Sequence, residues 1–234
     1  MKNVLCFFMM AVILSTIVCS AEAIDASKTG GLPLIEGWHW QYSLLAENQD
    51  PTGEETATIK VGENESIEVK VKKISAIIKT VINKVEENEN FVLAEISGNL
   101  AKKNNQNSEY WFFDKATGKI WLGSDKVKKK FNVKTSGLPE GEPFLILPLK
   151  IGQGWGADTE TERDDHWYQW YVEAEESITV PAGTFNCLRL AYRTNPDHEL
   201  IWFCPNVGII KQEYVHHGSV GNIFMELTSY GLAK

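Results

Sequence analysis

The stretch Ile178–Tyr214, ITVPAGTFNCLRLAYRTNPDHELIWFCPNVGIIKQEY, decides the fold because it contains three predicted β-strands and their turns. Residues 181–183, Pro-Ala-Gly, predict a tight turn, since proline presets φ and glycine admits a positive φ. A strand begins near Thr184, and four residues with strong turn chemistry follow at 194–197. The chain then returns through 199–204, so the sequence predicts an antiparallel hairpin.

The turn of this hairpin also predicts its register. If residues 194–197 form the whole loop, Arg193 faces His198, and counting back places Cys187 opposite Cys204. Cross-strand Cβ atoms at a non-hydrogen-bonded pair lie about 4.5 to 5.5 Å apart, close to the separation in a disulfide. We therefore predict a Cys187–Cys204 disulfide, with two free buried thiols as the alternative.

The same register separates the two faces of the hairpin. One face is mostly apolar and consists of Leu188, Leu190, Tyr192, Glu199, Ile201 and Phe203. The other carries the two cysteines and places Arg189 beside Trp202, where a cation–π contact is expected. The apolar face is predicted to pack on the core.

The N-terminus predicts export. Met1–Ala23 has a positive residue at Lys2, an apolar run over 4–19 and small residues before the end, as in a signal peptide, so the mature chain is predicted to begin at Ile24. No later apolar run is long enough for a membrane span. The expected location is the bacterial periplasm or the exterior.

A lipid anchor at Cys19 is the alternative to ordinary cleavage. The cysteine of a bacterial lipobox usually follows a small residue, whereas Val18 is bulky. We therefore expect no anchor.

Charge narrows the class of partner. The 234-residue chain carries a formal charge of −8, which opposes binding to nucleic-acid phosphates. No linker divides residues 24–234, so a single β-domain is expected.

Short runs of alternating polarity, separated by turn residues, occupy most of this region, as in Trp38–Leu44. The segment 74–85 also fits helical spacing, but its many β-branched residues favour a strand, and helix stays the alternative. The predicted fold is an all-β antiparallel meander with little helix, forming a strongly curved sheet or an open or closed barrel.

Aromatic residues suggest where a ligand would bind. The strands at 110–113 and 167–171 carry large aromatic side chains on both faces, which one covered face alone cannot receive. A concave, aromatic-lined surface for a ligand is one explanation, and a thick core is the other. The candidate ligand-binding residues are Trp40, Trp111, Phe113, Trp170 and Trp202.

Catalytic and metal-binding signals are weak. No nucleophile-elbow motif is present, and His216 and His217 are adjacent on a strand end, so they are expected to point to opposite faces. We predict no catalytic residue, no metal and no cofactor.

The C-terminal part of the chain resembles a group of exported bacterial proteins of unknown function. The resemblance lies in residues 147–152 with Trp155, the VPAGTF turn at 180–185, Trp202-Phe203, and 207–211. It implies a curved antiparallel sheet similar to the half-barrels of the lipoprotein carriers LolA and LolB, but a shared fold does not imply a shared function.

Three functions remain open. The first is an exported envelope protein that binds an apolar or amphipathic small molecule on a concave face. The second is a structural or protein-interaction module of the envelope without a small ligand, and the third is carbohydrate binding or glycoside hydrolysis, with tryptophans stacking on sugar rings and paired acids as catalysts.

Overall fold

The computed structural model describes residues 26–60, 66–98, 109–124, 141–156, 165–195, 197–217 and 219–232. The predicted signal peptide and Cys19 lie outside these residues. Within them the chain forms one short 3₁₀ turn, η1 (Ala26–Thr29), and thirteen strands. The strands are β1 (Trp38–Gln49), β2 (Glu55–Lys60), β3 (Ser66–Glu87), β4 (Phe91–Gly98), β5 (Glu109–Asp114), β6 (Lys119–Ser124), β7 (Leu145–Ile146), β8 (Gly154–Trp155), β9 (Trp170–Val180), β10 (Gly183–Arg193), β11 (Asp197–Cys204), β12 (Gly208–His216) and β13 (Gly221–Leu232).

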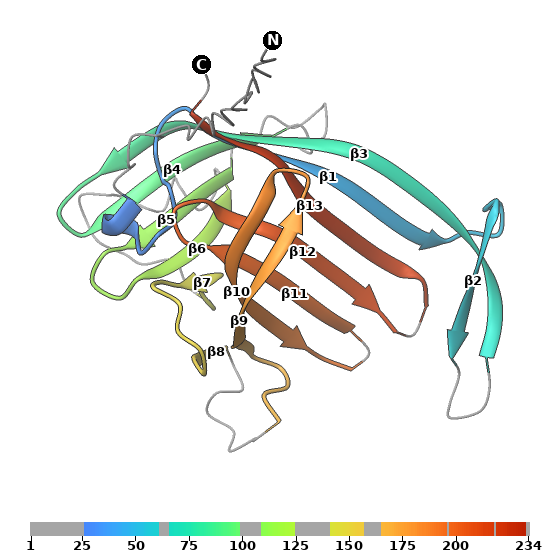
Figure 1. Cartoon of the computed structure of the whole chain (residues 1–234). Helices are drawn as coiled ribbons and strands as arrows, with labels where there is room; N and C mark the ends of the chain where they lie inside the picture. Colours follow the sequence, from blue (N-terminus) through green and yellow to red (C-terminus); the bar gives the residue numbers. More distant parts are fainter. Residues whose placement is uncertain are drawn as a thin grey trace, which may run out of the picture.

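All the strands belong to one antiparallel, strongly curved sheet (Figure 1). Its order is β7-β6-β5-β4-β3-β1-β13-β12-β11-β10-β9-β8, and β2 pairs with β3 beside this path. Most sequence neighbours are therefore sheet neighbours. The exceptions are that β1 pairs with β3 and β13 rather than with β2, and that β7 and β8 lie at opposite ends of the order. Among the residues that the structure describes, hydrogen bonds do not close the sheet into a barrel. The predicted all-β meander is confirmed, in its open form.

The uncertain segment 74–85 is a strand, as predicted. It belongs to β3, which runs unbroken for 22 residues and pairs with β2 over 66–71, with β1 over 71–81 and with β4 over 80–87. This pairing satisfies backbone polar groups along the strand, and β-branched side chains suit a pleated surface. Segment 74–85 is thus a strand because it pairs with neighbouring strands, although its apolar residues are also spaced as in a helix.

The predicted hairpin is β10–β11, and its register is confirmed. Arg193 pairs with His198 and Arg189 with Trp202. The strands on either side continue the same face assignments, because β11 pairs with β12 and β10 with β9. Leu190 and Ile201, on the predicted core face, have no exposed surface.

One face of the sheet carries the main hydrophobic core. On β1, the alternate residues Trp38, Trp40 and Tyr42 are buried, and the core continues across β3, β4 and β10 to β12. Two buried donors find backbone acceptors there: the Trp40 indole N–H donates to Val207 O at 2.6 Å and the Tyr42 hydroxyl to Ile209 O at 3.0 Å. Burial raises the pKa of Tyr42.

A second, smaller core lies on the opposite face of β4, β5 and β6. Its members are Phe91, Leu93, Tyr110, Phe112 and Trp121. Tyr110 and Phe112 are buried here, whereas Phe113 packs in the main core, so both faces of β5 are covered. At this strand, the thick-core explanation of the paired aromatic residues is correct.

The far part of the sheet extends beyond both cores. In Figure 1, β2 and the adjoining parts of β1 and β3 project to the right of the main body. Exposed apolar side chains lie along this part, including Ile67, Ile74 and Ile77 on β3 and Ile223 on β13.

The β9–β10 hairpin bends across the sheet. Its tip contacts β13, where the Ala182 N–H donates to Leu227 O at 3.0 Å, and Figure 1 shows the hairpin in front of β12 and β13. Phe185 meets Tyr230 edge to face, with ring centroids 5.8 Å apart. The tip of the hairpin therefore packs against the main core beside β13.

No helix among the described residues is long and apolar enough to span a membrane.

Candidate functional site

The candidate site is a groove on the sheet face opposite the main core, over β3, β1, β13 and β12. Strand pairing aligns eight of its lining residues in two rows. The first row is Ile77, Ser43, Glu226 and Lys211, and the second is Ser75, Leu45, Phe224 and Glu213. Directly paired residues share a face of a sheet, so all eight side chains point to the same side.

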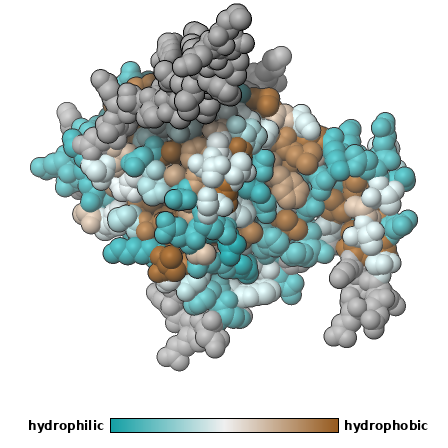
Figure 2. Space-filling view, viewed as in Figure 1, coloured by the Kyte–Doolittle hydropathy of each residue, from teal (hydrophilic) through white to brown (hydrophobic). Residues whose placement is uncertain are grey.

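The floor of the groove is apolar. Leu45, Ile77 and Phe224 supply it, and Ile77 remains 53% exposed. The volume is about 630 Å³, within the range of small-molecule sites. Figure 2 shows hydrophobic residues gathered between hydrophilic ones over the part of the sheet where β1 and β13 run. The surface is suited to a hydrocarbon chain.

Charged residues occupy the end of the groove formed by β12. Lys211 Nζ lies 2.8 Å from Glu213 and 3.6 Å from Glu226, and 5.2 Å from the centre of the Trp202 ring. Burial opposes the charged form of Lys211, but these two carboxylates raise its pKa overall. The cation over Trp202 is therefore Lys211, where the sequence predicted Arg189.

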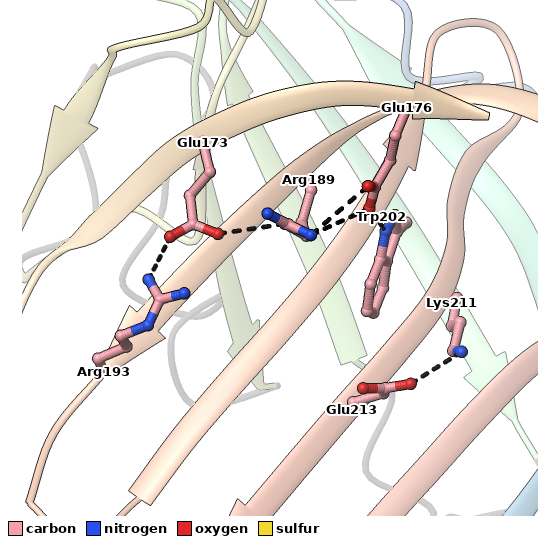
Figure 3. A network of polar contacts seen from close by, with 7 residues as sticks. All are labelled: Glu173, Glu176, Arg189, Arg193, Trp202, Lys211 and Glu213. Atoms are coloured by element: carbon pink, nitrogen blue, oxygen red, sulfur yellow. Dashed lines mark hydrogen bonds and ion pairs between the residues drawn. The ribbon is translucent and has the colours of Figure 1, made fainter. Parts of the chain in front are cut away.

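Arg189 belongs to an adjoining network of ion pairs, shown in Figure 3. Its Nε donates to Glu173 at 3.1 Å, and its Nη1 lies 3.4 Å from Glu176. Glu173 also pairs with Arg193, and Glu176 accepts the Trp202 indole N–H. A bulge in the β9–β10 pairing leaves Glu173 unpaired in the ladder, which brings its carboxylate between the two arginines. The network positions Trp202 beside Lys211.

A second lysine with two carboxylates lies beyond the other end of the groove. Lys73 Nζ is 2.6 Å from Glu55 and 3.4 Å from Glu47. The hydrogen bond to Glu55, followed by that to Glu47, raises the pKa of Lys73. Glu47 pairs with Lys73 two residues along β1 from Leu45, so this cluster lies on the groove face.

All five predicted ligand-binding residues belong to the main core or pack against it. Trp40 and Phe113 are only 2% and 3% exposed, and Trp111 packs against the core with its ring 5.7 Å from that of Trp40. Phe113 also lines a separate hollow of about 610 Å³ near η1 and the β5–β6 turn. Trp40 has little surface left for a ligand, because the chain itself covers it.

Trp202 is a buried member of the same core, and Trp170 packs against it. Trp170 stacks on Trp155 with ring centroids 6.4 Å apart and contacts Tyr192. Trp202 is 6% exposed and contacts Lys211 at the groove. The structure thus brings all five residues into or against the main core, and Trp202 contacts the groove residue Lys211.

Sequence reasoning missed the groove residues themselves. Alternation over Trp38–Leu44 predicts a half-buried strand with Ser43 on its polar side, and Leu45 lies just beyond this run. In the structure both residues face away from Trp40 and Tyr42. Their partners come from β12 and β13, more than 160 residues later. Alternation assigns residues to a face but does not reveal which strands share it.

Both predicted disulfide cysteines are free thiols in the structure. Cys187 is buried, Cys204 is half-buried, and a hydrogen bond joins their side chains. This hydrogen bond raises the pKa of Cys187 and lowers that of Cys204. The register that motivated the disulfide is present without the bond, which stays a prediction.

The histidines near the β11–β12 end separate as expected. His216 pairs with Asp197 and lowers the pKa of that carboxyl, while His217 contacts His198 with 2.7 Å between ring nitrogens. Adjacent strand residues point to opposite faces, which explains the separation. Among the residues that the structure describes, no group of three or more His, Cys, Asp or Glu side chains is arranged to hold a metal ion.

One protein family matches a part of the chain. The family described as DUF3108-like matches residues 167–220, which span β9 to β12. No curated protein sequence matches the chain significantly.

Two solved structures are similar over most of the chain. One is a protein from Bacteroides fragilis described as exported, with a YmcC-like fold, at 12% identity and a TM-score of 0.44, covering 84% of this chain and 96% of that one. The other, from Parabacteroides distasonis, is described as a lipoprotein, at 14% identity and a TM-score of 0.37, covering 86% and 97%. The likeness to LolA and LolB stays a prediction.

Proposed function

We propose that residues 24–234 form one exported β-domain of the bacterial envelope that binds an amphipathic small molecule in the groove over β3, β1, β13 and β12. A single observation carries this proposal: two aligned rows of side chains form an apolar floor that ends at the Lys211 cluster. The floor offers apolar area to a hydrocarbon chain, and the charged end offers partners to a polar group.

The proposal keeps the ligand class expected from the sequence and changes its location. Aromatic rings were expected to line the surface, but Trp40 and Phe113 are buried in the core. The groove instead uses aliphatic residues and Phe224, with Trp202 as a support for Lys211.

A test compares two isoleucines of one strand. Ile77 lines the groove and is 53% exposed, whereas Ile67 lies outside it and is 51% exposed. Decyl maltoside, kept below its micelle concentration, serves as a neutral probe in isothermal titration. We expect Ile77→Asn to weaken binding at least about tenfold, because the polar amide disrupts the apolar floor. Ile67→Asn should bind as the wild type does.

Equal affinity in the two variants, or no binding by the wild-type protein, would contradict the proposed site. Native mass spectrometry of the protein purified from its own envelope provides a second measurement. A small molecule that remains bound to the wild type and is absent from Ile77→Asn would identify the natural ligand.

A protein-interaction module is the second candidate. Ile74 and Ile223 both pair with Ala46, so they lie together on the other face of the projecting strands, and they are 48% and 41% exposed. Apolar residues on both faces of these strands suit a protein partner. Recovery of one stoichiometric envelope protein, lost on Ile74→Asn but retained on Ile77→Asn, would favour this function.

Carbohydrate binding has less support. Sugar rings stack on exposed aromatic faces, whereas Trp40, Trp121, Trp155 and Trp202 are all 6% exposed or less.

A further inference from the structure

We infer that the groove selects amphiphiles with a cationic head group. This inference rests on the proposed function, since it concerns the ligand of the same groove. It follows from the balance of charge at the two ends of the apolar floor.

At the β12 end, the one cation has two carboxylate partners. Lys211 contacts both Glu213 and Glu226, and its ammonium also lies over Trp202. These three charged groups sum to one negative charge. The side chains of Glu213 and Glu226 are 23% and 39% exposed, so their free lone pairs are accessible from the groove.

The adjoining arginines do not change this balance. Arg189 and Arg193 are held by Glu173, and Arg189 also lies near Glu176. The two arginines are therefore balanced by the two carboxylates of Glu173 and Glu176, and this network adds no net positive charge beside the groove.

The opposite end repeats the arrangement. Lys73 contacts Glu47 and Glu55, again one cation with two carboxylates. Four residues separate Ser43, beside Glu226, from Glu47, which corresponds to about 13 Å along the strand. The apolar floor therefore lies between two clusters that each carry one excess negative charge.

This arrangement discriminates between head groups. An anionic head would be repelled by the excess charge and would have to displace a carboxylate to reach either lysine. A primary or quaternary ammonium is instead attracted by the excess negative charge of the Lys211 cluster while its alkyl chain covers Leu45, Ile77 and Phe224. The affinity for an amphiphile with a neutral head group should lie between the affinities for the anionic and the cationic ones.

The experiment measures the affinities of decyltrimethylammonium, decyl maltoside and decyl sulfate, which share one chain length, below their micelle concentrations. We expect the cation to bind at least about tenfold more tightly than the sulfate, with the maltoside in between. Added salt should narrow the difference, because it screens exposed charges.

A matched pair of double variants distinguishes the effect of the groove carboxylates from the effect of the overall charge of −8. The double variant Glu213→Gln and Glu226→Gln should lose most of the preference. Glu68→Gln with Glu89→Gln changes the net charge equally at exposed sites outside the groove, and it should keep the preference. Urea midpoints of both variants confirm that each is folded.

Different negative results overturn different proposals. Equal binding of the three amphiphiles, with Ile77→Asn still impaired, would overturn the head-group inference and leave the groove as the binding site. A cation preference that survives in the Glu213/Glu226 variant would also overturn the inference. Absence of binding by all three would overturn both proposals.

Discussion

The two faces of β3 differ in what covers them. Ile82 lies on the core face and has no exposed surface, whereas Ile77, five residues earlier on the groove face, is 53% exposed. Both residues lie in paired backbone, since Ile77 pairs with Ser43 of β1 and Ile82 with Ile96 of β4. Regular pairing therefore builds the sheet, and only the covering layers determine where it is stable and where it is open to a ligand.

The largest expected effect is a difference in stability between these two isoleucines. Ile82→Ala should lower the free energy of unfolding by about 3 kcal/mol, because it leaves a cavity in the core. Ile77→Ala should change it by less than about 0.5 kcal/mol, because its side chain is already hydrated. Urea denaturation measures both. Similar losses in the two variants would show that the projecting part of β3 is covered in solution.

The next effect concerns the two thiols, which lie on the groove face of β10 and β11. With glutathione disulfide as oxidant, we expect Cys187 and Cys204 to form a disulfide while the oxidant is reduced to two thiols. The mass of the protein falls by two hydrogens, and the bridge should stabilise the β10–β11 hairpin by about 2 kcal/mol.

Mass spectrometry and urea midpoints, with and without reductant, measure this change. If the unfolded oxidised protein still accepts an alkylating group on both cysteines, the predicted disulfide does not form.

The smallest effect is expected at the ion-pair network. Burial opposes ionisation of Glu173, but Arg193 and Arg189 lower its pKa below the ordinary value of 4.5. A lowered pKa in the folded state contributes stability above the ordinary pKa, and this contribution disappears as the pH falls through the folded value. Because these groups are partly exposed, Glu173→Gln should cost only about 1 kcal/mol at pH 7.

Urea denaturation of wild type and variant at neutral pH and below pH 4 tests this expectation. The two proteins should converge in stability at acidic pH. Glu175→Gln, at an exposed position two residues further along β9, serves as the control and should not reproduce the pH dependence. A constant difference between wild type and Glu173→Gln would contradict the assignment.

Local chemistry explains which predictions about the fold were correct. The turn at 194–197 determined the pairing of Arg193 with His198, because a four-residue loop leaves one register for the adjoining strands. The strand at 74–85 could likewise be identified, since its β-branched residues favour a pleated backbone. Both features depend on residues close together in the chain.

The candidate site depended on contacts that are distant in sequence. Trp40 and Phe113 were plausible ligand contacts by residue type, yet β1 and β5 place them in one core with the segment around Val207. Conversely, Ser43 and Leu45 gave no functional signal by themselves, because their significance lies in their partners on β3 and β13.

The sequence by itself determined the all-β class, the order of most strands and the two faces of the central hairpin, because alternation and turn chemistry act over a few residues. The tertiary structure alone decided which faces are covered. It joined Ser43 to Ile77 and Glu226, placed Lys211 over Trp202, and left an apolar groove between two acidic clusters. The physical reason is that burial and electrostatic balance are properties of neighbours in space, and here those neighbours lie as many as 183 residues apart.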